Sequence, residues 1–306
     1  MGRDARSPEA VYSQLSCAVR QTAPDPEWCR ALSATGATAL EAVLRRDRLI
    51  VAASLAVLTM IAWAYVLWLA RSMNSDGMAM QGMDAASVDV MMMSGFRSWS
   101  TTEFAVTMLM WVVMMIGMMT PSAAPMILLY ARVGRHGEVQ GKPLAATGFF
   151  VAGYFLAWTA FACAATLGQW ALESTLLLTP MMTSASGIFS GVTLIAVGLF
   201  QWTPLKDVCL RQCQAPVMFI HLHGGFRRDP LGSVALGFRH GIYCIGCCWA
   251  LMGLLFIGGV MNVLWIAAVA IFVLAEKLVA RGRWFSRLSG VGLCLAGLWL
   301  LGATIL

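Results

Sequence analysis

Charged residues are scarce in this sequence: they make up 12% of the 306 residues, against 59% hydrophobic residues. Soluble globular proteins carry about twice that share of charge, and the mean hydropathy of +0.74 lies far above their usual range. The scarcity of charge excludes an ordinary soluble domain. It predicts an all-α, polytopic transmembrane helical bundle that has the lipid bilayer as its surroundings.

Other absences narrow the function. We expect no cleavable signal peptide, because the first residues carry charges such as Arg3 and Arg6 and contain no apolar core. The sequence shows no phosphate-cradling Gly-rich loop or aspartyl-phosphate motif, which excludes movement driven by ATP hydrolysis on this chain. The net charge of +6 comes from basic residues scattered over short connectors, which excludes nucleic acid as a partner. A binding protein is favoured over an enzyme, and enzymatic activity is left open.

About seven apolar segments are predicted to cross the bilayer as helices. They lie at 49–70, 103–130, 144–172, 186–202, 233–260, 263–274 and 288–306. The preceding residues 1–48 form a polar amino-terminal segment, and 49–306 form the transmembrane helical domain. All but Arg71 and Arg97 of the 21 Lys and Arg residues fall on one side of this arrangement. The positive-inside rule therefore predicts a cytosolic amino terminus and an outward carboxyl terminus.

Sulfur-containing residues, in contrast, are plentiful, with nine cysteines and 21 methionines. An odd number of cysteines spread over spans and inner connectors argues against a disulfide framework, so we expect mostly free thiols. The densest group lies in the fifth apolar segment, at spacings of three and four residues that place its members along one helix face. These are His240, Cys244, Cys247, Cys248 and Met252.

Imidazole, thiol and thioether on one face are the ligands that Cu(I) and Zn(II) select, whereas a pathway for hard ions would present carboxylates and carbonyls. The alternative is that the cysteines act as small buried hydrophobic residues, with Gly237 and Gly241 only allowing two helices to pack closely. The clustering favours a ligand or redox site over this packing interpretation.

The predicted inner connector 203–232 carries a second group of possible ligands. If a helical turn forms there, Cys209 and Cys213 share one face at i and i+4, which suits chelation of one metal. His221 and His223 follow, and for them a polar pair at the membrane interface is favoured over ligation.

Methionines gather in the predicted outer loop 71–100 and in the second apolar segment. Thioethers bind Cu(I) and stay competent in an oxidising compartment, so the loop could capture the ion; a flexible loop whose methionines dip into the interface is the alternative. In the second segment Met110, Met114 and Met118 form one stripe, for which helix packing is the simpler interpretation and a ligand ladder the functional one.

Two further features of the apolar segments are unusual. Pro121 and Pro125 are expected to kink or break the second helix. Glu276 and Lys277 close the sixth segment, where an interfacial ion pair is favoured over a proton or ion site.

The predicted topology places thioethers outside and thiols inside. Thiolates bind Cu(I) more tightly than thioethers, which leads to the hypothesis that a captured ion moves inward or is held for a recipient, a metallochaperone or metalloenzyme. Zn(II) is the alternative metal, and a homo-oligomer is a further option.

These motifs also carry a resemblance. The sequence resembles a bacterial family known as predicted metal-binding integral membrane proteins, whose members are sometimes labelled copper chaperones. The resemblance is carried by Met110–Pro125, Gln201–Lys206 with Cys209 and Cys213, and Gly241–Met252, and it continues through Gly259–Asn262 to Glu276 and Lys277. It implies metal binding and a multi-pass protein of the bacterial inner (cytoplasmic) membrane.

Three functions stay open. The first is binding of a soft metal ion, with Cu(I) favoured, for transport, delivery or homeostasis. The second is a thiol–disulfide oxidoreductase that uses Cys244 and Cys247 with Cys209 and Cys213, although the expected inner location faces a reducing compartment. The third is a non-catalytic scaffold subunit of a membrane complex.

Overall fold

The computed structural model describes residues 49–72, 99–136, 143–175, 177–178, 184, 186–227, 229–279 and 282–305. Its elements in these ranges are helices, and the β-pairing within them is one isolated bridge between Leu178 and Ser184. The all-α prediction is therefore confirmed for the described residues. The predicted amino-terminal segment 1–48 and nearly all of the methionine-rich loop 71–100 lie outside them.

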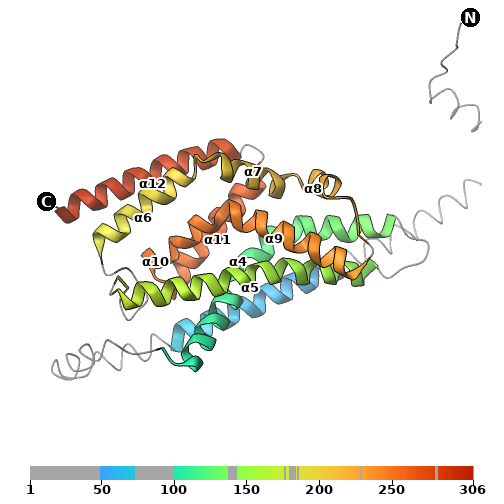
Figure 1. Ribbon diagram of the computed structural model, residues 1–306, viewed down its shortest axis with the longest axis horizontal. Helices are drawn as coiled ribbons and strands as arrows, with labels where there is room; N and C mark the ends of the chain where they lie inside the picture. Colours follow the sequence, from blue (N-terminus) through green and yellow to red (C-terminus); the bar gives the residue numbers. More distant parts are fainter. Residues whose placement is uncertain are drawn as a thin grey trace, which may run out of the picture. The chain divides into compact units, whose positions relative to one another are not determined.

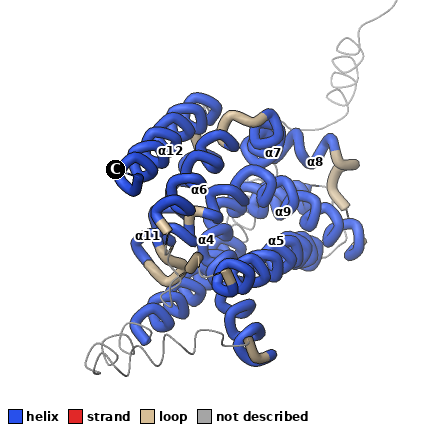
Figure 2. The backbone as a smooth tube through the Cα atoms, turned by 60° about the vertical axis from the view of Figure 1, so that its left-hand side comes forward, coloured by secondary structure: helices blue, strands red, loops and turns tan. Residues whose placement is uncertain are grey.

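The described residues form one unlabelled helix, Leu49–Ser72, and nine labelled ones (Figure 1). These are α4 (Thr101–His136), α5 (Pro143–Ser174), α6 (Gly187–Phe200), α7 (Pro204–Gln214), α8 (Pro216–Leu222), α9 (Pro230–Gly253), α10 (Leu255–Gly258), α11 (Val263–Leu278) and α12 (Gly282–Ile305). Helix α5 packs along α9 and α4, α7 lies against α9, and α6 pairs with α12 (Figure 2).

Five helices of the described residues are long and apolar enough to cross a membrane: Leu49–Ser72, Thr101–Val133, Ala146–Ser174, Pro230–Gly258 and Trp284–Ile305. The number rises to six if α6 and α7, which meet at a bend of 64°, form one broken span. Helix α11, the predicted sixth span, has 16 residues. The count of seven spans and the orientation stay predictions.

Local sequence sets where the helices around the thiols begin. Thr203 caps α7 by accepting the backbone N–H of Lys206, with Pro204 as the first helical residue. Asp229 caps α9 in the same way, and Asn262 caps α11. A side-chain oxygen at this position satisfies one of the backbone N–H groups that a helix start leaves free, and proline fits there because it has no N–H to lose. The helical turn predicted for Cys209 and Cys213 is confirmed.

Helix α4 runs without a break through Pro121 and Pro125. Nearby hydroxyls bond back to its own carbonyls: Thr120 donates to Ile116 O at 2.6 Å and Ser122 to Met119 O at 2.9 Å. Of the expected kink or break, the break does not occur, and packing against neighbouring helices supports the backbone around a proline. The methionine-rich half of α4 and Ser122 therefore belong to one continuous helix.

Glycines let α5 and α9 approach until their backbones touch. A Cβ added at Gly237 would collide with the carbonyl oxygen of Phe150, and one added at Gly153 would collide with that of Val234. A Cβ at Gly241 would come within 2.6 Å of the Cβ of Ala157. The close-packing role considered for Gly237 and Gly241 is therefore confirmed, and it coexists with the thiol cluster one turn further along α9.

Candidate metal centre

Helix α9 buries the face on which its possible ligands lie. His240, Cys244, Cys247, Cys248 and Met252 are each at most 3% exposed. The spacing of three and four residues places them in successive turns of the side that packs against α5 and α7. The predicted cluster is thus an interior feature of the bundle.

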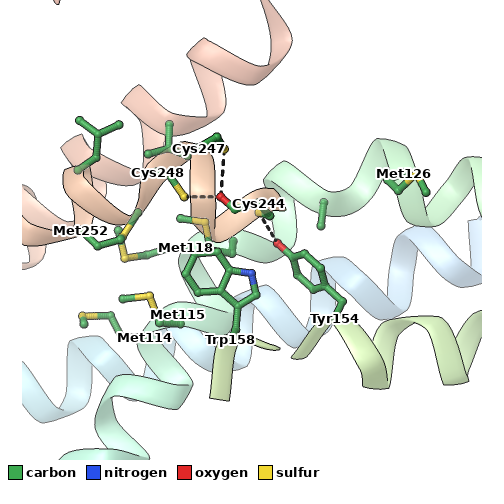
Figure 3. Close-up of a cluster of buried hydrophobic side chains, with 14 of the residues drawn as sticks. Met114, Met115, Met118, Met126, Tyr154, Trp158, Cys244, Cys247, Cys248 and Met252 are labelled. Carbon is green, nitrogen blue, oxygen red and sulfur yellow. Dashed lines mark hydrogen bonds between the residues drawn. The ribbon is translucent and has the colours of Figure 1, made fainter. Parts of the chain in front are cut away.

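The three thiols of α9 divide into two kinds by their hydrogen-bond partners. Cys247 Sγ and Cys248 Sγ each donate to the backbone oxygen of Cys244 at 3.0 Å, so both are turned along their own helix (Figure 3). Cys244 Sγ instead faces neighbouring helices, with the Tyr154 hydroxyl at 3.1 Å and the Lys277 ammonium at 2.9 Å. Cys244 is therefore the polar centre of the group.

Helix α7 brings its two cysteines to the same place. Cys213, which is half-buried, lies beside the thiols of Cys244 and Cys247. Cys209 is buried against Gly246 of α9, where an added Cβ would lie 2.7 Å from the Cys209 sulfur. Residues predicted from the connector and from the fifth segment thus meet in space, across about thirty residues of chain.

Thioethers from α4 lie on another side of these thiols. Figure 3 draws Met114, Met115, Met118 and Met252 with Cys248 in one cluster of buried side chains, and all five belong to the hydrophobic core. Met114, Met115 and Met118 are at most 2% exposed. Met110, the first residue of the predicted stripe, is buried in the same hydrophobic core.

His240 lies one turn before Cys244 among aromatic rings. Its ring centroid is 5.0 Å from that of Phe219 and 5.8 Å from that of Tyr154. Its Nδ1 atom is buried and has no hydrogen-bond partner within the described part of the chain. A buried ring nitrogen without a partner is costly, and coordination of a metal is one way to satisfy it.

His221 and His223 do not join the thiol group. His221 is exposed, while the His223 Nδ1 lies 2.8 Å from the carbonyl oxygen of Phe219 and its ring packs on that of Phe219. His223 thus closes the end of α8 instead of pairing with His221. Ligation by these two histidines gains no support from the geometry.

The expectation of an interfacial ion pair between Glu276 and Lys277 is wrong. Both residues are buried, at 1% and 8% exposure, and they have separate partners. Consecutive residues of a helix point about 100° apart, so they do not face one another. Lys277 donates to Cys244 Sγ and, at 3.0 Å, to Ser122 Oγ.

Glu276 belongs to a second polar group, which we term the Lys206 cluster: Gln201, Lys206, Glu276 and Ser286. The Lys206 ammonium lies 2.8 Å from both carboxylate oxygens of Glu276, and it also donates to Gln201. The Ser286 hydroxyl donates to the same carboxylate at 2.9 Å. The cluster ties the end of α6 to α7, α11 and α12.

The sequence interpretation missed two groups that touch the thiols, Lys277 and Tyr154. A lysine inside an apolar segment was the available signal for the first. The tyrosine gave no signal, because it lies some ninety residues from Cys244 in the chain and only the packing of α5 on α9 brings it close.

The thiols do not form a completed metal site as they stand. Within the described residues, no three or more His, Cys, Asp or Glu side chains are grouped so that they could hold a metal ion. Two of the thiols are held by a backbone carbonyl and the third by Lys277 and Tyr154. Binding of an ion therefore requires the thiols to exchange these hydrogen bonds for metal bonds.

Comparison with known proteins supplies one match. A family model described as "PpoB2: Copper chaperone" matches residues 108–300, which is more than half of the chain. No curated protein and no solved structure matches the chain. The matched region contains every candidate ligand from Met110 to Met252.

Proposed function

The chain belongs to the PpoB2 family of copper chaperones, and from this premise we propose that it binds Cu(I) within its helical bundle and delivers the ion to a copper-requiring partner. One observation carries the proposal: thiols of α7 and α9 meet in the interior, and thioethers of α4 belong to the same buried core. No single helix supplies this donor set. It exists only when the three helices are packed together.

The chemistry of the donors favours Cu(I). Cys213 of α7 supplies a thiol that lies beside the thiols of Cys244 and Cys247 of α9. Met118 and Met252 supply thioethers in the same buried core as these thiols. Soft thiolate and thioether ligands select Cu(I), whereas a structural Zn(II) site takes four thiolate or imidazole ligands in a tetrahedron.

Differences in burial suggest the direction of delivery. The α9 thiols are at most 2% exposed, while Cys213 of α7 is half-buried. An incoming ligand from a metallochaperone or metalloenzyme therefore reaches Cys213 first. We propose that Cu(I) passes from the α4 thioethers to the α9 thiols and leaves through Cys213, by ligand exchange and without a change in oxidation state.

The predicted location fits this route. Helices long and apolar enough to cross a membrane make up most of the described chain. We propose that the protein lies in the inner membrane of a bacterium, with α7 and the amino-terminal end of α9 toward the cytosol. This orientation rests on the asymmetry of Lys and Arg residues along the sequence.

Burial disfavours the alternative of a thiol–disulfide oxidoreductase. Exchange requires a thiolate to attack a substrate sulfur directly, so the attacking thiol must be accessible. Cys244 and Cys247, the Cys-x-x-Cys pair, are 1% and 2% exposed. An ion can enter such an interior by exchange between side chains, but a protein disulfide cannot.

The test is the copper content of the detergent-purified full chain after loading with Cu(I). We expect about one tightly held copper ion in the wild type and loss of this ion when Cys244, Cys247 and Cys248 are all changed to Ser. The matched control is Cys163→Ser on α5, a half-buried free cysteine outside the thiol group, which should keep its copper.

Unchanged copper in the triple variant would refute the proposed site. Free thiols should be counted on the same samples. A metal-free wild type with Cys244 and Cys247 joined as a disulfide would instead support the oxidoreductase.

A further inference from the structure

Lys277 occupies an unusual position for a lysine. It is 8% exposed, lies on α11 within the apolar part of the chain, and donates to Cys244 Sγ at 2.9 Å and to Ser122 Oγ at 3.0 Å. A buried ammonium is costly unless it meets a negative charge. A serine hydroxyl supplies only a dipole, so the negative partner must come from the sulfur side.

Among the residues that the structure describes, no carboxylate competes for this role. Glu276, the neighbouring residue, points to the Lys206 ammonium, which binds both of its oxygens. Within the described part of the chain, Lys277 forms no ion pair with Asp or Glu. The charge of Lys277 is therefore available to balance negative charge on the thiol group.

We propose that Lys277 is the counter-charge of the copper site and that it makes the site selective for a monovalent soft cation. This inference rests on the proposed function. With two thiolates as ligands, that of Cys244, which Lys277 contacts, and that of Cys213 beside it, one Cu(I) gives a net charge of minus one, which a single ammonium neutralises. The same two thiolates with Zn(II) are already neutral, so the ammonium would leave a net positive charge in the interior, which is unfavourable.

The binding step balances with one proton. In the metal-free protein on this proposal, Lys277 and Cys244 together carry no net charge, and the second thiol, that of Cys213, carries its hydrogen. When Cu(I) enters, it forms bonds to both sulfurs, the S–H bond of the second thiol breaks, and that proton leaves to water. Nothing is oxidised or reduced. The interior has the same net charge before and after binding, which minimises the cost of placing an ion there.

The experiment compares the affinities of the full-length purified protein for Cu(I), held at defined free concentrations by a competing chelator, and for Zn(II). Lys277→Met keeps the length and apolar stem but removes the charge. We expect it to lower the Cu(I) affinity, relative to the Zn(II) affinity, by about tenfold or more. Lys277→Arg keeps the charge and should retain the wild-type preference for Cu(I).

The matched control removes another buried lysine. Lys206→Met combined with Glu276→Gln deletes the ion pair between α7 and α11, the helix that also carries Lys277. The net charge of the thiol group stays the same. It should leave the ratio of Cu(I) to Zn(II) affinity unchanged. A preference for Cu(I) that survives Lys277→Met, in a protein whose wild type binds Cu(I), would overturn the role of Lys277 and leave the proposed function standing. A wild type that binds no Cu(I) would overturn both.

A second measurement applies if Lys277→Met does not fold. The first equivalent of Ag(I), a redox-stable analogue of Cu(I), should release one proton from the wild-type protein into a weakly buffered solution. Release of two protons would mean that both thiols were protonated in the metal-free protein and that neither balanced the charge of Lys277. Release of none would mean that no second thiolate forms. Either result would overturn the inference.

Discussion

Two lysines are buried in the described part of this bundle, Lys206 and Lys277, and they have opposite kinds of partner. Lys206 of α7 meets the carboxylate of Glu276 and the amide of Gln201, and Ser286 completes that group. Lys277, next to Glu276 on α11, meets a thiol and a hydroxyl. The two side chains leave adjacent positions of one helix, yet one enters a group whose charges cancel and the other enters a group rich in sulfur.

The two lysines differ in whether the protein itself balances their charge, and this distinguishes a structural role from a binding role. A lysine paired with a carboxylate has its charge balanced by the protein itself, so the Lys206 cluster needs nothing from outside and can hold four helices together. A lysine whose neighbours are thiols keeps a charge that a bound metal–thiolate group can balance. Similar residues therefore act as a structural tie in one place and as part of a candidate binding site in the other.

The largest effect should come from breaking the Lys206 cluster. Glu276→Gln leaves the Lys206 ammonium buried without its negative partner, and loss of one member of a buried pair costs about 3–5 kcal/mol of unfolding free energy. Thermal unfolding of the detergent-purified protein measures this loss. The double change Lys206→Met with Glu276→Gln should recover most of it. A single variant as stable as the wild type would show that this pair does not hold the helices together.

A smaller effect should come from separating α7 from α9 at the thiol group. In Gly246→Ala the new Cβ would lie 2.7 Å from the Cys209 sulfur, so that either this side chain or α7 must shift. Overpacking of this kind costs about 1–3 kcal/mol, and copper affinity should fall with it. Gly253→Ala is the control, because a Cβ there meets nothing within 4 Å. Equal behaviour of the two variants would mean that the spacing of α7 and α9 does not matter.

Cys213→Ser should affect copper and leave stability nearly unchanged. The residue is half-buried, so the swap of sulfur for oxygen disturbs packing little, but it removes one soft ligand. We expect Cu(I) affinity to fall by about tenfold, or 1.4 kcal/mol. Competition with a Cu(I) chelator measures the change, with Cys163→Ser as reference. If both variants bind Cu(I) as the wild type does, Cys213 is not a ligand.

The smallest effect should come from Tyr154→Phe. This change removes the hydroxyl that lies 3.1 Å from Cys244 Sγ and keeps the ring. A single lost hydrogen bond costs about 0.5–1.5 kcal/mol in unfolding free energy. Cu(I) affinity should stay close to that of the wild type, because Lys277 still faces Cys244. Tyr243→Phe, at a ring that packs on Phe219, is the reference. A large loss of copper would place Tyr154 among the metal-binding groups.

Much of the candidate site could be predicted because helical spacing is a local property. Cys244, Cys248 and Met252 fall on one face whatever surrounds α9, and capping by Thr203 starts the helix that aligns Cys209 with Cys213. That Met114 belongs to the same buried core as these thiols was not predicted. Which helix faces which depends on contacts between distant segments, and spacing within one segment carries no information on them.

The sequence by itself determined that the chain is built of apolar helices and that soft ligands share one face of α9, because composition and the period of the helix decide both. Only the tertiary structure decided that Lys277 faces Cys244 while Glu276 faces Lys206. The reason is physical: two adjacent residues on a helix diverge by about 100°, so each must find its partner on a different neighbouring helix. The packing of α4, α7 and α9 around α11 supplies those partners.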